Sequence, residues 1–463
     1  MTTTVLAPAT PVPATSAGPK TQVGAPRGHI GRIVTATIAG GLLTATVAVM
    51  GPFAGAEEHV ITGTVLAVFA ASWALLGSLS ARWTDQPQSW ARVPAAVMAI
   101  ASVFLLTVAP TGNEAGWAWP AAALAMAAWM TRQSRRQLRS RARVLVLYPV
   151  FAALAISAVG GAYETYRETT AAGASAMPGR LVDVGGHRLH LDCTGTGRPT
   201  VVLQAGMGEV SPMMAAWLAP EVAGTTRVCV YDRAGRGWSD PVDHPQDGEA
   251  VATDLHNLLA NAGEPGPYVL AGHSAGGIYT LSFAHLFPAD VAGVVLLDSM
   301  HPDQYELLPS WPGFYERYRR ASAVMPSLSR LGVSRLISDA QYGDLPAAQR
   351  SQERELLATP AHNRSVRDEF NQIRTALGQA AKLDSLGDTP LVVLTAERDA
   401  EPAWFTMQDD LATLSTDSVH RTLSDANHQM VVADEDVAAE AGVAILDVVD
   451  AVRTSMPLNP EAR

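Results

Sequence analysis

A serine stands at the centre of one short stretch whose residue types suit nucleophilic chemistry. Residues 268–277 read YVLAGHSAGG, so Ser274 is flanked by Gly272 and Gly276. Glycine at both positions leaves room for a sharp turn, because a Cβ at either place would clash with a neighbouring strand or helix. A serine on a strained strand-to-helix turn exposes its hydroxyl, and the pattern is typical of a nucleophile elbow.

The elements around Ser274 favour this interpretation. Tyr268–Ala271 is typical of a buried strand, and an apolar helical pattern runs from Ile278 to Phe287 before Pro288. The first N–H groups of such a helix point toward the serine, at the place where negative charge will develop. An ordinary helix N-cap serine is the alternative, and the strand and helix on either side argue against it.

Composition divides the chain into two parts. The chain has 463 residues and a formal net charge of −11, and its length exceeds one ordinary domain. Basic residues outnumber acidic ones over residues 1–170, whereas acidic ones dominate the remainder. This acidic part argues against nucleic acid as a partner. The sequence has no zinc-type Cys/His spacing, no P-loop and no dinucleotide-binding glycine motif, and we expect no metal and no organic cofactor.

The first part of the chain predicts a membrane region. Residues 1–28 lack apolar periodicity and predict a disordered cytoplasmic tail. Residues 29–165 predict an all-α transmembrane region of about five helices, because a helix needs close to 20 apolar residues to cross a bilayer core of about 30 Å. The five apolar stretches are Ile33–Ala56, Val60–Ala81, Val93–Ala109, Ala115–Met130 and Val144–Ala162.

Charged residues between these stretches predict the orientation. Basic residues precede the first stretch and lie between the second and third, and six arginines lie between Arg132 and Arg143. The positive-inside rule places these segments in the cytoplasm, so five spans put everything after about residue 165 outside. We therefore expect a multi-pass protein of the cell membrane. The first stretch is alternatively a signal peptide, since Ala54-Gly55-Ala56 resembles a cleavage site.

The second part of the chain predicts an α/β fold. Two alternating segments, Leu181–Val184 and Arg188–Cys193, are separated by two glycines and are typical of a hairpin. Short Val- and Leu-rich segments follow, with helical patterns such as Val251–Ala262 between them, and they favour a mostly parallel sheet that is buried on both faces. These segments are Thr200–Gln204, Arg227–Tyr231, Tyr268–Ala271, Gly293–Leu297 and Leu391–Thr395.

Residues 180–455 resemble the α/β-hydrolase family, and this segment covers about 60% of the chain. The order and spacing of the matching motifs are jointly specific. The motifs are residues 203–208 (LQAGMG), 231–240 (YDRAGRGWSD), the stretch around Ser274, 294–298 (VVLLD), 391–394 (LVVL) and the late His428. The resemblance implies an α/β-hydrolase fold, and the long segment after Asp298 implies a helical cap at about residues 299–388.

The resemblance also implies a catalytic triad with Ser274 as the nucleophile, His428 as the base and Asp399 as the acid. His428 lies in a loop after a strand-like segment, and Asp399 follows the strand Leu391–Thr395 by a few residues. The chain order serine, acid, histidine matches the family. Neutral imidazole takes the serine proton and returns it to the leaving group. The alternatives are Glu397 and Asp298 for the acid, and His301 and His420 for the base.

Two backbone N–H groups are expected to form an oxyanion hole. By resemblance they belong to Met207, in the loop after the third strand, and to Ala275, the residue after the nucleophile. The loop has Ala205-Gly206 where the family usually has His-Gly, and this departure affects the support of the loop but not the backbone donor. We expect His273 to pack under the elbow.

Cys193 and Cys229 are the only cysteines of the sequence. In the usual strand order of the family their strands are neighbours, so a disulfide between them is geometrically feasible. A disulfide would fit a compartment outside the cytoplasm. Two small buried thiols are the alternative interpretation.

These features together lead us to expect a membrane-anchored serine hydrolase. Its substrate would be a small-molecule or lipid-like ester, thioester or amide, and its reaction would pass through an acyl-enzyme. An acyltransferase with the same triad is one alternative, and a non-catalytic membrane sensor or scaffold is another. Haloalkane dehalogenation is disfavoured because it needs a carboxylate where Ser274 stands.

Overall fold

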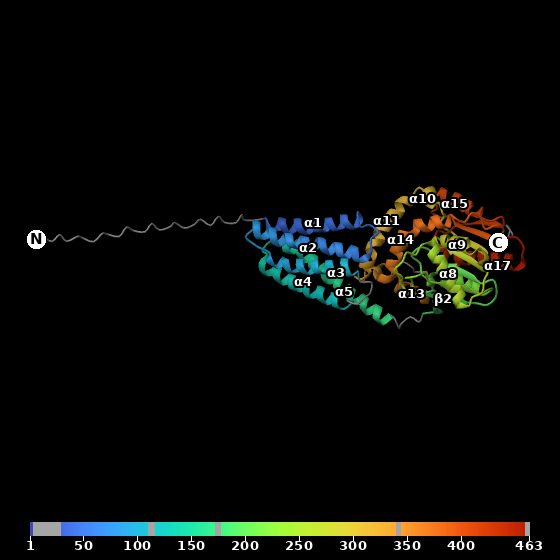
Figure 1. The fold of residues 1–463 in the computed structure, drawn as a ribbon, viewed down its shortest axis with the longest axis horizontal. Coiled ribbons are helices and arrows are strands. Elements are labelled where there is room, and N and C mark those ends of the chain that lie inside the picture. The colour runs from blue at the N-terminus through green and yellow to red at the C-terminus, as the bar shows by residue number, and fades with distance from the viewer. Residues whose placement is uncertain (3–28, 110–115, 172–176, 339–343, 459–463) are drawn as a thin grey trace.

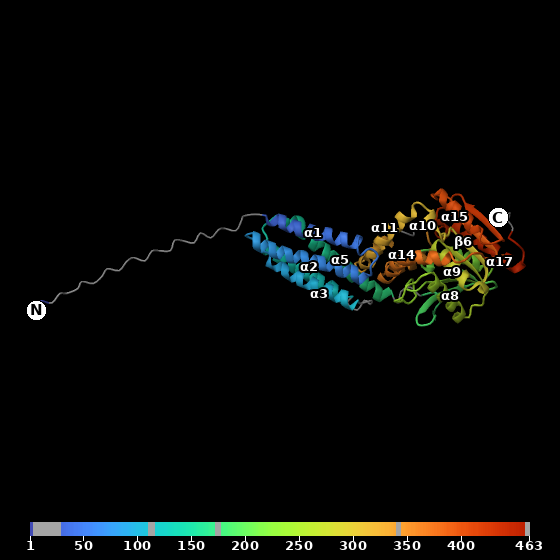
Figure 2. The same ribbon diagram turned by 45° about the horizontal axis from the view of Figure 1, so that its top comes forward.

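The computed structural model describes residues 1–2, 29–109, 116–171, 177–338 and 344–458. Most of the tail that the sequence predicts, residues 3–28, lies outside these residues. Long helices near the N-terminus form an elongated bundle, and a domain of helices around a sheet lies at one end of it (Figures 1 and 2).

The described part of the bundle contains five long helices. They are α1 (Ile30–Met50), α2 (Glu58–Trp83), α3 (Arg92–Val108), α4 (Ala118–Gln137) and α5 (Tyr148–Ala171), with short turns η1 (Ser89–Ala91) and η2 (Arg143–Leu147) before α3 and α5. Within the described residues, four segments are long and apolar enough to cross a membrane: α1, α2, η1 with α3, and η2 with α5. The sequence predicts about five spans, and α4 falls short because arginines occupy its last turns.

The bundle is apolar both inside and outside. Trp73, Trp90 and Phe151 pack together in its buried core. Large apolar side chains also point outward from the helices, among them Ile100 and Ile156. A water-soluble bundle would place polar residues there, so the exposed apolar surface suits contact with lipid.

The second part of the chain contains a sheet of eight strands within the described residues, in the order β1-β2-β4-β3-β5-β6-β7-β8. The pairs β1–β2 and β2–β4 are antiparallel and all the others are parallel. This arrangement confirms the predicted α/β-hydrolase fold. The strands are β1 (Arg180–Asp183), β2 (Arg188–Thr194), β3 (Val201–Gln204), β4 (Val228–Tyr231), β5 (Tyr268–His273), β6 (Val291–Leu297), β7 (Leu391–Ala396) and β8 (Ser418–Leu423).

Helices cover both faces of this sheet. Residues of β3, β5 and β7 are buried throughout, which explains why these strands are continuously apolar rather than alternating. One face packs against α6, α7 and α17, and the other against α8 and α9. The helices outside the cap are α6 (Ser211–Ala216), α7 (Leu218–Ala223), α8 (Gly248–Ala262), α9 (Ala275–Leu286), η3 (Pro288–Asp290), α15 (Pro402–Ala412), α16 (Met430–Ala433) and α17 (Glu435–Thr454).

A helical cap connects β6 to β7 and lies between the sheet and the bundle (Figure 1). It contains α10 (Gln304–Leu307), α11 (Trp311–Ser329), α12 (Val333–Ser338), α13 (Ala347–Leu357) and α14 (Pro360–Ala380). Ion pairs fasten the cap to the bundle: Glu58 of α2 contacts Arg330 and Arg364, and Glu164 of α5 contacts Arg335. The cap therefore contacts both the sheet domain, to which it is connected, and the helical bundle.

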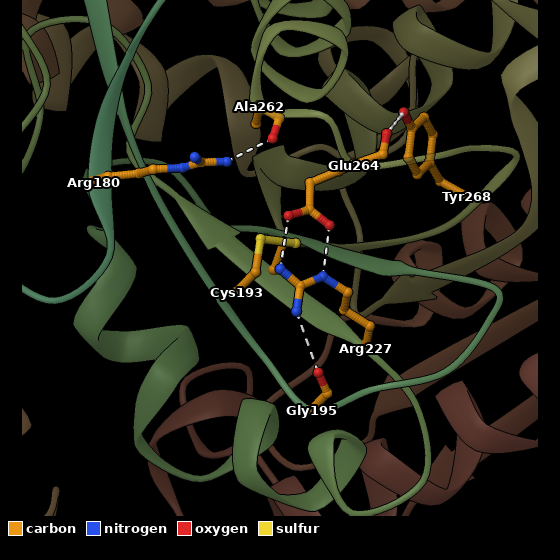
Figure 3. Close-up of a disulfide and its surroundings, with 8 residues drawn as sticks. Arg180, Cys193, Gly195, Arg227, Ala262, Glu264 and Tyr268 are labelled. Carbon is orange, nitrogen blue, oxygen red and sulfur yellow. Dashed lines mark hydrogen bonds and ion pairs between the residues drawn. A yellow bond between two sulfur atoms is a disulfide. The ribbon is translucent and has the colours of Figure 1, made fainter.

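A disulfide joins β2 and β4, two neighbouring antiparallel strands next to the edge strand β1. Cys193 of β2 and Cys229 of β4 are register partners, and their sulfur atoms are bonded. Next to the disulfide, Arg227 binds the carboxylate of Glu264 through two hydrogen bonds of 2.6 and 2.7 Å (Figure 3). The structure thus adopts the bonded form rather than the alternative of two free thiols.

Candidate active site

Ser274 occupies a strained turn between β5 and α9. Its backbone has a φ of 55° and a ψ of −123°, a region that non-glycine residues rarely adopt. An ideal Cβ on Gly272 would lie 2.5 Å from the carbonyl oxygen of Gly276, and one on Gly276 would lie 2.1 Å from that of Gln204. Both glycines are therefore required for the turn, as the sequence predicts.

His428 approaches the serine from the loop between β8 and α16. Its Nε2 lies 3.0 Å from the Oγ of Ser274, which is hydrogen-bond distance for a base and its nucleophile. The imidazole stacks on the ring of His273, with the centroids 4.8 Å apart, and meets the indole of Trp404 edge-on. About half of the side chain remains exposed, at 46%, so the ring is held on one side and open toward the cavity.

Asp298 holds the other nitrogen of His428. Its Oδ2 lies 2.5 Å from Nδ1 of the imidazole, and its Oδ1 accepts hydrogen bonds from the backbone N–H of Ala396 and the indole N–H of Trp404 at 3.1 and 2.8 Å. Asp298 directly follows β6 and is buried. A buried carboxylate with both oxygens bonded is well placed to fix the tautomer of the histidine.

The prediction that Asp399 contacts His428 is wrong. Asp399 lies in an exposed turn beyond β7 with a φ of 69°, and its carboxylate makes no hydrogen bond with any described residue. The reason lies in how the two strand ends pack. Asp298 is buried at the end of β6 between Ala396 and Trp404 and contacts the imidazole, whereas the turn that carries Asp399 is exposed. Glu397, the other alternative acid, also makes no side-chain hydrogen bond to His428 in the described structure.

Two carboxylates hold the loop that carries Met207. The N–H of Gly206 donates to Glu209 at 2.5 Å, and the N–H of Gly208 donates to Glu369 of α14 at 3.0 Å. Between them, the N–H of Met207 has no hydrogen-bond partner among the described residues. The N–H of Ala275, at the start of α9, also lacks one within the same residues. The two predicted oxyanion donors are therefore both available.

Glu369 is the centre of a buried network. It accepts hydrogen bonds from Arg233 and Tyr279 at 2.9 Å each and also pairs with Arg236. Burial alone would raise the pKa of Glu369, but the guanidinium groups of Arg236 and Arg233 hold this pKa below its ordinary value. Arg233 also donates to the carbonyl of Gly206 at 2.7 Å, so the network fixes the loop through both its N–H and its C=O groups.

His273 links the same loop to His428. Its Nδ1 lies 3.1 Å from a carboxylate oxygen of Glu209, and its Nε2 lies 3.1 Å from the backbone carbonyl of His428. Both ring nitrogens face oxygen acceptors, an arrangement that favours the doubly protonated imidazole. Burial alone would lower the pKa of His273, but Glu209 holds it above its ordinary value. His273 packs under the elbow as expected and also supports two other parts of the site.

Sequence reasoning missed Glu209 and Glu369. Glu369 lies 161 residues from Gly208 in sequence and belongs to an amphipathic cap helix that gives no local sign of its role. Glu209 directly follows the predicted loop and accepts a hydrogen bond from the N–H of Gly206. The family usually has a histidine beside this glycine, and its absence here was the signal that a different side chain supports the loop. The other histidines weighed as bases are paired elsewhere: His301 contacts Asp410, and His420 contacts Asp409.

The site opens into a cavity of about 920 Å³ beneath the cap. Ser274, Met207 and His428 lie in its wall, and much of the remaining lining is apolar, including Trp311 and Phe314 of α11. Asp399 lines the same cavity without touching the imidazole. A cavity of this size accommodates an organic molecule whose apolar portion lies against the cap.

Comparison with known proteins agrees with this fold. A model described as the alpha/beta hydrolase family matches residues 201–441, just over half of the chain. The chain therefore belongs to the α/β-hydrolase family.

Individual relatives are distant. An uncharacterized protein of Schizosaccharomyces pombe is 27% identical over 302 residues, which cover 57% of this chain and 54% of that protein. An uncharacterized protein of Bacillus subtilis is 29% identical over 128 residues, which cover 27% of this chain and 39% of that protein. The chain thus spans about half the length of the first relative and less of the second.

Solved structures share the fold. The Cif epoxide hydrolase from Acinetobacter nosocomialis superposes with a TM-score of 0.50 at 15% identity, covering 62% of this chain and 95% of that one. At this identity the likeness concerns the fold alone.

Proposed function

We propose that the protein is a membrane-anchored serine hydrolase that cleaves an ester, or a related thioester or amide, through an acyl-enzyme. The observation that carries the proposal is the continuous chain from Ser274 Oγ through His428 to the buried Asp298, with distances of 3.0 and 2.5 Å. Membership of the α/β-hydrolase family supports it. The candidate membrane spans support the anchoring.

In the acylation step, Ser274 Oγ attacks the carbonyl carbon while His428 Nε2 takes the serine proton. The negative charge on the tetrahedral oxygen is stabilised by the backbone N–H groups of Met207 and Ala275, and Asp298 stabilises the imidazolium. The bond to the leaving group then breaks, and His428 gives its proton to the departing oxygen, sulfur or nitrogen.

Deacylation repeats these steps with water as the nucleophile. His428 takes a proton from the water, whose oxygen attacks the acyl carbon, and the bond to Ser274 Oγ breaks. The proton returns to Oγ, so that the products are a carboxylic acid and the free enzyme. Apart from that of the attacking water, each role falls to a residue of this chain.

A fluorophosphonate probe tests the proposal directly, because it reacts with an activated serine. We expect covalent labelling of the purified full-length protein and its loss in Ser274→Ala and His428→Ala. Ser282→Ala is the matched control and should label normally. Ser282 lies on α9, the helix that follows Ser274, and is buried away from the cavity lining. A folded wild type that does not label, or a Ser274→Ala variant that still does, would favour a non-catalytic sensor or scaffold.

A further inference from the structure

The cap meets the bundle at a corner between α11 and α12. An ideal Cβ on Gly160 or Gly161 of α5 would lie only 2.2 or 2.9 Å from carbonyl oxygens of this corner, so glycine is needed for the close approach. One turn further along α5, Glu164 accepts two hydrogen bonds of 2.9 Å from Arg335 of α12. The corner is therefore fixed to a candidate membrane span.

The second half of α11 packs against the same end of the bundle. Ala323 is buried in an apolar cluster with Val49 of α1 and Ile61 of α2. The hydroxyls of Ser327 and Thr62 lie 2.7 Å apart. Since α1 and α2 are also candidate spans, α11 reaches from the hydrolase domain into the end of the membrane region, as the views of α11 beside the bundle illustrate (Figures 1 and 2).

Aromatic side chains mark the depth of this corner in the bilayer. Tyr163 and Tyr166 are exposed on α5, and exposed tyrosines on a spanning helix are typical of the interface between hydrocarbon and water. Tyr163 follows Gly161 by two residues, which is about 3 Å along a helix axis. This spacing indicates that the corner that packs on Gly160 and Gly161 is at the level of the interface when α5 spans a bilayer.

The short helix α12 presents apolar side chains at this level. Leu336 is 75% exposed and Ile337 is 48% exposed. The opposite side of α12 is buried and polar: Ser334 and Ser338 lie inside, and Arg335 pairs with Glu164. The ion pair thus turns the two apolar side chains outward. In a membrane at this depth they would face lipid and head groups, and such an environment suits exposed apolar side chains.

The cavity that contains Ser274 extends to the same corner. Phe314, Tyr318 and Met325 line it along one face of α11, and the eleven residue steps from Phe314 to Met325 correspond to about 16 Å of helix. Ile337 both lines the cavity and is half-exposed, so it stands where the cavity meets the outside. Apolar side chains of α11 and α12 thus border the path from the corner to the serine, together with the hydroxyls of Ser334 and Ser338.

We infer that the substrate is the ester of a long acyl chain that resides in the membrane, and that it enters sideways past α12. The acyl chain lies along α11 while its carbonyl reaches Ser274, whose acylation and hydrolysis proceed as described above and release a fatty acid and an alcohol. This inference rests on the proposed hydrolase function and adds the substrate class and the route of entry.

The test uses the full-length protein reconstituted in phosphatidylcholine vesicles with two p-nitrophenyl esters. The butyrate remains largely in water, whereas the palmitate partitions into the bilayer. For the wild type we expect the rate on palmitate to exceed that on butyrate at least tenfold. Leu336→Asp places a charge at the interface and should lower the palmitate-to-butyrate ratio about tenfold.

Leu307→Asp is the matched control, because Leu307 is also an exposed leucine on a short cap helix but adjoins the opposite end of α11. It should leave the ratio unchanged. Butyrate hydrolysis without a palmitate preference, or an equal ratio in Leu336→Asp and wild type, would overturn the lipid inference while leaving the hydrolase intact. If neither ester is hydrolysed and the fluorophosphonate does not label Ser274, the proposed function itself is wrong and the inference falls with it.

Discussion

The carboxylate beside His428 determines how the imidazole is oriented and how well its positive charge is stabilised. Asp298→Asn keeps the volume of the side chain but can present an N–H to Nδ1, which favours the tautomer that cannot accept the serine proton. We expect kcat on a water-soluble ester to fall by about 10⁴-fold. Asp399→Asn should change kcat by less than about threefold, because its carboxylate does not contact the imidazole in the structure.

Steady-state kinetics of both variants, beside an unfolding curve for each, separate the two carboxylates. An Asp298→Asn enzyme with normal turnover, or an Asp399→Asn enzyme whose turnover falls by several orders of magnitude, would contradict the assignment of Asp298 and favour Asp399 as the acid. The unfolding curves ensure that a loss of activity reflects chemistry rather than loss of the folded state.

Sequence patterns selected the serine and the histidine that the structure brings together, but not the carboxylate that contacts the histidine. Ser274 has a local signature in its flanking glycines, and His428 lies in a loop just after the last strand. The acid has no such local sign, because a carboxylate follows both β6 and β7 and only the packing of the strand ends selects between them. Asp298 was among the alternatives, and its buried position between Ala396 and Trp404 is a tertiary property.

The cap helix α14 does more than cover the cavity, because Glu369 holds the N–H of Gly208 next to the candidate oxyanion donor. Glu369→Gln removes the charge that pairs with Arg233 and Arg236 and weakens this hold on the loop. We expect kcat to fall about 10- to 100-fold with little change in KM, since Met207 would stabilise mainly the transition state.

Asp368→Asn provides the control for that experiment. Asp368 is the neighbouring residue on α14, is partly exposed and pairs with Arg367 rather than with the loop. Its replacement should leave kcat within about twofold. Equal effects at both positions, or a Glu369→Gln variant that changes only the unfolding midpoint, would show that Glu369 stabilises the cap without positioning the loop.

At the scale of elements, the sequence predicted the strands to within a few residues. Their apolar runs and bounding glycines and prolines are local features, so β1 to β8 could be identified before their pairing was known. The arrangement of the cap could not be predicted in the same way. The contacts of α11 and α14 with the bundle join residues more than 250 positions apart, and no periodicity in either helix specifies them.

At the scale of the whole molecule, the side of the membrane on which the hydrolase domain lies depends on whether α4 crosses the bilayer. α4 runs antiparallel to α5 along its length: Gly116 accepts a hydrogen bond from Thr165 near one end, and Arg143 donates to the carbonyl of Leu138 at the other. If α5 crosses the bilayer, α4 traverses the same thickness. Hydropathy alone does not reveal this, because the final turns of α4 carry Arg135 and Arg136.

Five crossings place the arginine-rich turns and the hydrolase domain on opposite sides. The turn before α3 and the turn after α4 lie together at the end of the bundle far from the cap, where the backbone N–H of Arg139 donates to the side chain of Gln86 at 2.7 Å. The positive-inside rule assigns this end to the cytoplasm. The disulfide between Cys193 and Cys229 would then lie in the compartment that favours its formation.

Fusions to a reporter that is active only outside the cytoplasm test this arrangement. We expect activity when the reporter follows Gly55 or Leu458 and none when it follows Arg139, because the α4–α5 turn is cytoplasmic in the five-span arrangement. A chain in which α4 does not cross would show the opposite pattern at two positions, active after Arg139 and silent after Leu458. Fusion protein levels measured by immunoblot ensure that a silent reporter is present, so the three positions together distinguish five spans from four.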